Sequence, residues 1–570
     1  MSDPDTPHSA SLREHARRLR RIPLVRLFET DPGRTDALAF EWHDWYVDLS
    51  KLHLDDAAFA TLVDAAHERN LTHWIAALFA GEKVNQSEQR PALHPALRAP
   101  TSESVVVDGI DVVPGIHATR MQMEALCRDL RNGVRRGATG RPFTLVVNLG
   151  IGGSHLGPQL VCDALDPIAT PSAEADPCIP SARFVANVDP AELARAVAGV
   201  DPGEILFVVA SKSFTTAETL ANARAARAWL EGIPAIGARA ASHFIAVTSN
   251  DAEARRFGLS GDAILTFPEG VGGRHSLWSA IGFAAAARLG WPAFAQLLEG
   301  AHAMDVHFRS TPLARNLPVA LGLAGWWNSR WLGYAQRVVV PYSRALVRLP
   351  AWLQQLELES NGKSVTRDGS SIDGPTAPAV WGDVGTDSQH SYFQWLHQGS
   401  HEVPVEFVVP VAAAGAREAA VAGDARDVLL YDEGRQRMLV ANAFAQAEAL
   451  MCGRDGESLR DELVGQGLEG SRLEAAIAQR RCPGNRASTT LLLPKLDPHS
   501  LGALLALYEH RTFVEAIMYG INPFDQWGVE LGKTLAKPIE AALAAGVAPI
   551  ARADASTRRL VERARALGKP

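Results

Sequence analysis

Residues 144–158 read TLVVNLGIGGSHLGP, a short apolar run followed by a glycine-rich segment and then an apolar helical pattern. A strand, a glycine-rich turn and a helix N-terminus in this order present free backbone amides to an anion, and glycine lets a ligand approach closely. The dinucleotide-binding fingerprint needs a glycine where His155 stands, and the P-loop needs Lys-Ser/Thr where Pro158 follows Gly157. The stretch therefore predicts a βα unit with an anion-binding turn; the alternative is a tight turn without a ligand.

Apolar runs of strand length continue beyond this unit and alternate with helical patterns such as 217–230. Runs this apolar, joined by helices, are typical of parallel sheets that are buried on both faces. A second alternation begins after a Trp-rich helical pattern at 318–332. We therefore expect an α/β fold with two doubly wound, mainly parallel sheets. The expected strands are 143–149, 183–187, 205–210, 244–248, 264–267, 337–341, 406–411 and 489–493.

Both ends of the chain are predicted to be helical. Between residues 12 and 136, the side chains of Trp42, Trp45, Leu49 and Leu52 recur at helical spacing, which favours an arm of helices over a sheet. From residue 521 onward the pattern is again helical and rich in alanine. The expected parts are a helical arm at 1–120, a first, smaller α/β domain at 121–292, a second, larger one at 293–520 and a helical tail at 521–570.

The composition is that of an average globular chain, with 570 residues of which 47% are hydrophobic and 21% charged, and this argues against disorder. The 56 Lys and Arg against 64 Asp and Glu leave a net charge of −8, so no global field attracts nucleic acid or anionic lipid. An anionic ligand must then be held by local groups. Five scattered cysteines without a C-x-x-C pair, and the lack of a signal-like apolar segment, predict a cytoplasmic protein.

A second donor-rich turn follows the expected strand at 205–210. The sequence SKSFTTAE, which begins at Ser211, places four hydroxyls and the ammonium of Lys212 at a strand-to-helix turn. Several neutral donors together with one cation suit a phosphomonoester. The alternative is an ordinary hydroxyl cap for the next helix, although a single hydroxyl is enough for a cap.

Two further segments carry candidate reactive groups. Arg274 follows two glycines and can stabilise oxyanion charge, unless it only pairs with a carboxylate. Glu357 and Glu359 stand about 200° apart on a helix, so only one of them can face a site. Glu359, next to a Ser-Asn-Gly turn, is the better candidate for a base, and Glu357 is then expected to be solvated. The alternative is that both carboxylates are solvated.

The histidines between 390 and 401 are candidates for proton transfer or metal binding. His390 lies at a polar turn and suits proton transfer, with a structural histidine as the alternative. His397 and His401 have the spacing of a metal pair, but Gly399 and Ser400 weaken the helix that this spacing requires. We therefore predict no metal site here.

Six blocks in order along the chain together resemble the phosphoglucose isomerase family. They are GIGGSHLGP, SKSFTTAET, GGRHSLWSAIGF, QQLELESNGK, GTDSQHSYFQWLHQG and INPFDQWGVELGK. The resemblance covers most of the chain and implies two sugar-isomerase-type (SIS) α/β domains with a helical tail, assembled as a homodimer. It further implies reversible interconversion of glucose 6-phosphate and fructose 6-phosphate, in glycolysis and gluconeogenesis, with no metal and no organic cofactor.

The resemblance also implies roles for single residues. Glu359 would shuttle the proton between C2 and C1 through a cis-enediol, and Arg274 would stabilise the enediolate. His390, donated by the partner subunit, would open the sugar ring together with Lys533. The residues that would bind the phosphate and the rest of the sugar are Gly153, Ser154, Ser211, Lys212, Ser213, Thr216, Gly273, Gln355 and Gln526.

Some positions depart from the commonest family pattern, namely Ser213, His275, Asp387-Ser388 and Pro523. The reactive groups are unchanged, so the reaction is expected to persist. Asp387 adds negative charge near His390, from which we expect an altered pH dependence. An isomerase of another phosphosugar, such as mannose 6-phosphate, shares every residue named. A non-catalytic regulator that binds sugar phosphates needs none of the reactive groups and usually carries a DNA-binding module, of which the sequence shows no sign.

Overall fold

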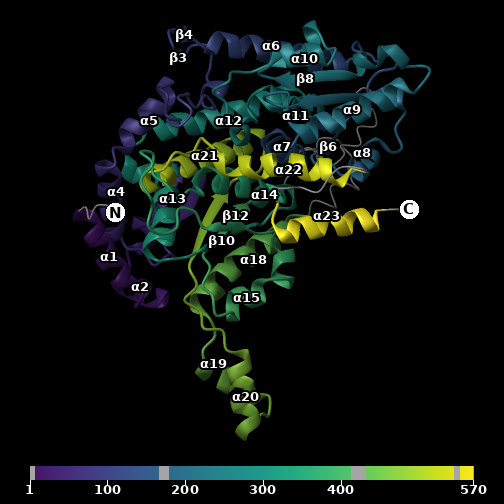
Figure 1. Cartoon of the computed structure of the whole chain (residues 1–570). Helices are drawn as coiled ribbons and strands as arrows, with labels where there is room; N and C mark the ends of the chain where they lie inside the picture. The colour runs from purple at the N-terminus through teal and green to yellow at the C-terminus, as the bar shows by residue number, and fades with distance from the viewer. Residues whose placement is uncertain (1–6, 166–178, 413–431, 545–552, 569–570) are drawn as a thin grey trace. The chain divides into compact units, whose positions relative to one another are not determined.

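The eight strands that the apolar runs predict are present in the computed structural model of the protein, which describes residues 7–165, 179–412, 432–544 and 553–568 (Figure 1). Their bounds differ from the prediction by at most two residues. The chain divides into two units, Met1–Pro523 and Phe524–Pro570.

The strands are β1 (Ala39–Trp42), β2 (Trp45–Asp48), β3 (Val106–Val107), β4 (Ile110–Asp111), β5 (Leu145–Leu149), β6 (Ser181–Val185), β7 (Ile205–Ala210), β8 (Phe244–Thr248), β9 (Ile264–Thr266), β10 (Gln336–Pro341), β11 (Ala379–Trp381), β12 (Val405–Pro410) and β13 (Ser488–Leu493). The α-helices are α1 (Pro7–Leu19), α2 (Leu24–Thr30), α3 (Arg34–Ala37), α4 (Asp56–Glu68), α5 (Leu71–Ala80), α6 (Val113–Arg131), α7 (Leu156–Leu165), α8 (Pro190–Val197), α9 (Ala217–Glu231), α10 (Asp251–Arg256), α11 (Phe283–Leu289), α12 (Trp291–Ser310), α13 (Leu317–Trp326), α14 (Leu349–Leu353), α15 (Phe393–Gln398), α18 (Glu433–Cys452), α19 (Gly456–Gly465), α20 (Gly470–Arg480), α21 (Pro498–Tyr519), α22 (Glu530–Leu543) and α23 (Ala555–Leu567).

The first sheet is parallel throughout, with the strand order β6-β5-β7-β8-β9. Alternate residues of its strands, such as Leu145, Val147 and Phe207, form one buried cluster with side chains of α8 and α9. Helices α6 and α11 contact the strands outside this cluster. Because β5, β7 and β8 are buried along their whole length, both faces of the sheet are covered, as predicted.

The second sheet has the order β1-β2-β13-β12-β10-β11, and its last four strands in this order are parallel. Helices α15 and α18 pack on one face, where Phe407 and Val409 of β12 are fully buried. Helix α21 lies against the other face, where the Tyr508 hydroxyl donates to the Glu406 carboxylate at 2.7 Å. The fold is therefore α/β with two mainly parallel sheets, which confirms the predicted class.

The N-terminal region differs from the prediction at residues 39–48. Helices α1, α2, α4, α5 and α6 are present, but Trp42 and Trp45 lie in an antiparallel hairpin of β1 and β2. Strand β2 pairs with β13, with Val47 opposite Leu491, and so extends the second sheet. The prediction of helical structure at Trp42 and Trp45 is wrong. Tryptophans three residues apart fit helical spacing, but an available strand edge far along the chain decides the local structure.

Helices α12 and α21 approach until their backbones touch. A Cβ added to Gly300 would lie 1.8 Å from the carbonyl oxygen of His499, and one added to Gly502 would lie 1.9 Å from that of Leu297. A side chain at either position would force the helices apart. The contact fixes α21, which is buried along most of its length and leads directly to the segment that contacts Arg274.

Two smaller parts complete the described chain. Helices α19 and α20 project from the second sheet as a hairpin (Figure 1), and they share a small core of Leu459, Leu463, Leu473 and Ile477. The second unit contains α22 and α23. The expected domain boundaries at 120, 292 and 520 stay predictions.

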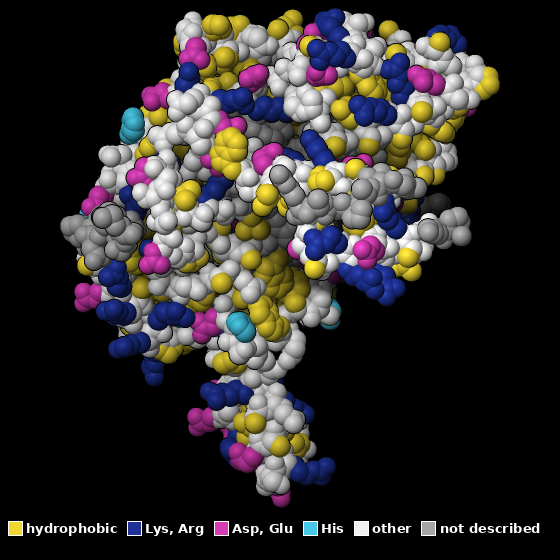
Figure 2. Space-filling model, viewed as in Figure 1, with side chains coloured by type: hydrophobic (Ala, Val, Ile, Leu, Met, Phe, Trp, Pro, Cys, Tyr) yellow, Lys and Arg dark blue, Asp and Glu magenta, His cyan; other side chains and the backbone are white. Residues whose placement is uncertain are grey.

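The surface mixes charges of both signs. Figure 2 shows Lys and Arg side chains interspersed with Asp and Glu over the face in view, in keeping with the net charge of −8. None of the helices in the described ranges is long and apolar enough to cross a membrane. The described cysteines form no disulfide, and Cys178 lies outside the described residues. An anionic ligand must therefore be bound by individual Lys or Arg side chains next to it and not by the net charge.

Candidate active site

The glycine-rich turn after β5 touches the turn that carries Arg274. Residues 152–154 form one 3-10 turn, in which Gly152 has φ +59°, a conformation that glycine adopts without strain. A Cβ added to Gly153 would lie 1.8 Å from the carbonyl oxygen of Gly273. The two turns are therefore in backbone contact, and Ser154 and Arg274 are carried on one continuous surface.

The donor-rich turn after β7 lies at the same edge of the sheet, because β5 and β7 are adjacent parallel strands whose carboxyl ends meet there. Its hydroxyls are paired: Ser211 Oγ lies 3.0 Å from Thr216 Oγ1, and Ser213 Oγ lies 2.7 Å from Thr215 Oγ1. Thr216 is the N-cap residue of α9, but its side chain makes no capping hydrogen bond. This arrangement favours a ligand cradle over an ordinary helix cap.

Lys212 supplies a cation to this turn. Burial lowers the pKa of its ammonium, and the neighbouring Arg90 adds to this effect, while Glu88 and Glu269 oppose it. Within the ranges that the structure describes, no carboxylate lies at ion-pair distance from its Nζ. A partly desolvated ammonium with neutral donors around it gains interaction energy when it binds an anion.

Arg274 is 4% exposed, and its guanidinium is held from several sides. Nε donates to Ser360 Oγ at 2.7 Å, Nη2 donates to the carbonyl oxygen of Pro523, and Nη1 lies 3.7 Å from Glu359 Oε2. Only one of these neighbours is a carboxylate. The guanidinium is therefore fixed in orientation by the protein, as a group that stabilises a developing oxyanion must be.

Glu359 ends a π-helical turn, Gln354–Glu359, that continues α14. Gln355 Nε2 donates to Glu359 Oε2 at 2.9 Å, and the same nitrogen would lie 2.9 Å from a Cβ added to Gly152. The side chain of Glu359 is 22% exposed, so it can reach a bound molecule. Single π turns inside helices are frequent at functional sites. The predicted residues Gly153, Gly273, Arg274, Gln355 and Glu359 thus come together.

Glu357 is not solvated, contrary to the prediction. It is 2% exposed and forms an ion pair with Arg337 on β10, which also binds Glu406 on β12 at 2.9 Å. The prediction assumed that a residue facing away from the site faces water, but the far face of this π turn packs on the second sheet. Glu357 therefore anchors the segment that carries Glu359.

Sequence reasoning missed a buried polar cluster next to Arg274. The rings of His94 and His275 stack with centroids 4.5 Å apart, and Nδ1 of His275 lies 3.6 Å from Glu509 Oε1. Burial lowers the pKa of both histidines.

Of the described residues, only His94, His275 and Glu509 have ligand atoms close enough to share a metal ion. The carboxylate of Glu509 already accepts from Trp278 Nε1 at 2.9 Å and from Arg98, and the rings are stacked, which fits a hydrogen-bonded network better. In the sequence, the departure of His275 from the commonest family pattern was the one signal that pointed to this cluster.

His397 and His401 are each engaged elsewhere. His397 Nε2 lies 2.9 Å from Gln446 Oε1, and the ring of His401 stacks on Trp395.

The roles of His390, Gln526 and Lys533 stay predictions. His390 is exposed at the end of the turn Asp387–His390, and no hydrogen bond or ion pair joins it to Arg274 or Glu359 in the described chain. Gln526 and Lys533 belong to the second unit, where Lys533 Nζ donates to Glu530 Oε1 at 2.9 Å.

Known proteins resemble this chain over nearly its whole length. The family profile described as phosphoglucose isomerase matches residues 48–561. Glucose-6-phosphate isomerase 1 of Chromobacterium violaceum is 42% identical over 558 residues and 98% of each chain, and glucose-6-phosphate isomerase of Aromatoleum aromaticum is 45% identical over 546 residues and 95% of each chain. The crystal structure of a glucose-6-phosphate isomerase from Chlamydia trachomatis is 29% identical, with a TM-score of 0.81 over 100% of both chains.

Proposed function

The chain belongs to the phosphoglucose isomerase family, and we propose on this premise that it interconverts glucose 6-phosphate and fructose 6-phosphate. The observation that carries the chemistry is the position of Glu359, 3.7 Å from the guanidinium of Arg274 and hydrogen-bonded to Gln355 beside the glycine-rich turn. A base and a fixed cation side by side suit proton abstraction next to a carbonyl. A non-catalytic regulator is not favoured, because the relatives matched over nearly their whole length are named as isomerases.

The donor-rich turn after β7, residues 211–216, is the phosphate cradle, which holds the phosphate group of the substrate. The ammonium of Lys212 supplies charge, and Ser211, Ser213 and Thr216 supply hydroxyls, with Gly153 and Ser154 on the neighbouring turn. Because the turn of Gly153 touches the turn of Arg274, a sugar bound by its phosphate extends toward the reactive groups.

Ring opening comes first and is assigned to His390 and Lys533, which exchange protons with the ring oxygen and the C1 hydroxyl. The carboxylate of Glu359 then removes the proton from C2 of the open aldose. The electron pair forms the C1–C2 double bond and places charge on O1, which Arg274 stabilises. The same carboxyl group returns its proton to C1, and a proton moves from O2 to O1, which yields the ketose.

Gln355 and Glu357 position the base. The amide of Gln355 holds one oxygen of Glu359, while the ion pair of Glu357 with Arg337 holds the π turn on the second sheet. Gln526 is assigned to the sugar hydroxyls.

We propose a homodimer in which His390 acts on the substrate of the partner subunit. The support is that His390 is exposed and bonded to none of the reactive groups of its own chain.

A coupled assay tests the function. Purified protein with fructose 6-phosphate is expected to produce glucose 6-phosphate, detected with a glucose-6-phosphate dehydrogenase, and the Glu359→Gln variant serves as the control. A parallel reaction with mannose 6-phosphate tests the alternative that the protein isomerises another phosphosugar. A folded protein that converts mannose 6-phosphate and leaves fructose 6-phosphate untouched would contradict the proposal.

A further inference from the structure

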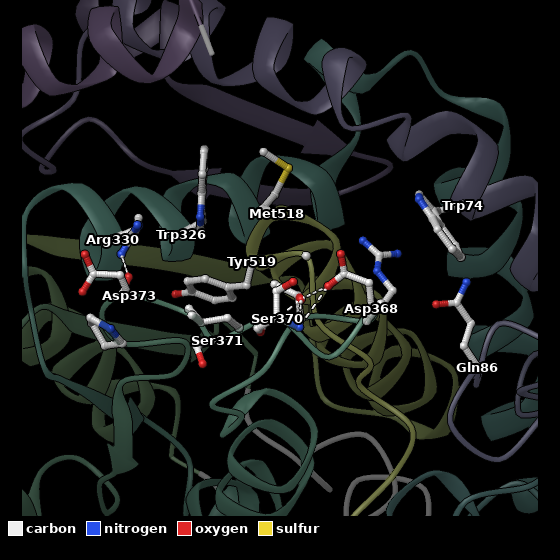
Figure 3. A pocket seen from close by; sticks show the side chains of 15 residues that line it. Trp74, Gln86, Trp326, Arg330, Asp368, Ser370, Ser371, Asp373, Met518 and Tyr519 are labelled. Atoms are coloured by element: carbon white, nitrogen blue, oxygen red, sulfur yellow. Dashed lines mark hydrogen bonds between the residues drawn. The ribbon is translucent and has the colours of Figure 1, made fainter. Parts of the chain in front are cut away.

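The first unit holds a cavity of about 600 Å³ whose lining includes none of the residues assigned to isomerisation. Its walls come from α5, the end of α13, the end of α21 and the loop 366–375. Figure 3 shows Trp74 and Gln86 at one end, Arg330 and Asp373 at the other, and Tyr519 between them. The volume is that of a site for a small organic molecule.

Arg367 is the unusual residue of this cavity. Its backbone N–H donates to the carbonyl oxygen of Gly520 at 3.0 Å, and its guanidinium lies over the ring of Trp74, 4.2 Å from the centroid. Among the described residues the guanidinium has no hydrogen-bond acceptor and no carboxylate partner, and its Nη1 is buried. Burial lowers the pKa of Arg367 to about 10, and Arg69 adds to this effect.

A second cation, Arg69, lies near Arg367. The guanidinium of Arg69 acts on the charge of Arg367, and it lies over the ring of Trp326, with 5.6 Å between the guanidinium carbon and the centroid. A partly buried cation without a counter-ion, close to a second cation, is destabilising for the folded protein. An anion bound in the cavity removes this cost and gains charge-assisted hydrogen bonds.

The acidic residues of the cavity do not neutralise Arg367. Asp368 and Asp373 are both exposed, so water screens their charges. The carboxylate of Asp368 accepts from the backbone N–H of Ser370 at 3.1 Å and from the hydroxyl of Thr366, and is used within its own turn. Within the described residues, the charge of Arg367 is therefore not neutralised by a carboxylate of the cavity.

We propose that this cavity binds a small organic anion, with a carboxylate or phosphate group on the guanidinium of Arg367 and a ring-shaped body against Tyr519 and Trp326. Aromatic walls favour a flat or ring-shaped body. The amide of Gln86 and the hydroxyls of Ser370 and Ser371 provide further polar contacts along the lining. The site is separate from the phosphate cradle and does not depend on the proposed isomerisation.

Titration calorimetry with phenyl phosphate and with benzoate tests the site on the full chain. Binding to the wild type and to an Arg17→Gln control on α1 is expected, with affinity lowered at least about tenfold in Arg367→Gln. Lys212→Gln separates this site from the phosphate cradle and is expected to keep the binding that depends on Arg367. Whichever probe binds more tightly identifies the charged group. Equal affinity of Arg367→Gln and the wild type for both probes overturns the proposal, as does loss of all binding in Lys212→Gln.

Two further measurements distinguish a ligand-binding role of Arg367 from a purely structural one. Replacing Arg367 by Met is expected to leave the melting temperature unchanged or to raise it, because the charge has no carboxylate partner in the described chain, whereas a structural role predicts a fall. Wild-type crystals soaked in 4-bromobenzoate need no variant, since the bromine is located by anomalous scattering. A bromine in the cavity with the carboxylate at Arg367 is expected, and a bromine bound only elsewhere overturns the assignment.

Discussion

Nη1 of Arg274 lies 3.7 Å from Oε2 of Glu359, a distance longer than a hydrogen bond. The two side chains come from different turns, one following the first sheet and the other continuing α14. Neither is fully satisfied by the other: Glu359 also accepts from Gln355, and Arg274 donates to Ser360 and to the backbone. In the proposed reaction, the guanidinium therefore keeps capacity to bind an enediolate oxygen while the carboxylate faces the proton that it moves.

Replacing Glu359 by Gln is expected to lower the rate of isomerisation by about 10²–10⁴, because the amide cannot accept the C2 proton. Binding of the phosphosugar is expected to persist, since the phosphate cradle is untouched. The coupled assay gives the rate, and NMR gives solvent deuterium entering at C2. The exposed Glu68 of α4, replaced by Gln, is the matched control. Exchange at C2 at the wild-type rate would show that another group is the base.

Replacing Glu357 by Gln is expected to lower the free energy of unfolding by about 3 kcal/mol. The loss of one partner from a buried ion pair leaves uncompensated charge, and Arg337 retains only Glu406. Urea unfolding measures the change, with the exposed Glu29→Gln variant as the control. An unchanged unfolding curve would mean that the π turn is held without this ion pair.

Alkaline pH is expected to lower kcat/KM through deprotonation of Lys212. Burial lowers the pKa of this lysine, so in the folded protein it loses its proton at a lower pH than an ordinary lysine, below 10.5. kcat/KM therefore falls as pH rises through the lowered pKa, because the neutral amine no longer attracts the phosphate. In the same window the unfolded chain binds more protons than the folded one, so the contribution of Lys212 to folding stability increases with pH. Lys212→Arg should move the fall of kcat/KM to higher pH. An identical pH profile for the variant and the wild type would show that Lys212 is not the group whose deprotonation lowers kcat/KM.

Mixed dimers are expected to recover activity. Glu359→Gln and His390→Ala are each expected to be nearly inactive alone, but a heterodimer has one site with both native groups if His390 acts across the interface. Activity is measured after subunit exchange, with exchange followed by mass spectrometry. Complete exchange without recovered activity would place both groups in the site of a single chain.

Removal of metal ions is expected to leave the rate unchanged, because the roles assigned to Glu359, Arg274, His390 and Lys533 need no Lewis acid. The coupled assay is run on protein dialysed against excess EDTA, with zinc and magnesium added back to separate samples. A rate that collapses on chelation and returns with one metal would rule out this mechanism.

Strands β5 and β7 were predictable because their apolar character is local, and the polar turns that follow them were found for the same reason. Glu359 was found from the turn beside it. The burial of Glu357 was not predictable, because a π turn changes which face of the segment meets the second sheet. The stacking of His94 on His275 joins segments far apart in the chain, and no local pattern encodes such a contact.

The pairing of β2 with β13 has a consequence for the order in which the protein is made. The first sheet can close as soon as β9 has left the ribosome, since all its strands lie between 145 and 266. The hairpin of β1 and β2 is synthesised much earlier than its partner strand, and its open edge has no neighbour until residues 488–493 emerge. For most of translation this edge is a surface that another nascent chain can join. The late-arriving β13 closes it.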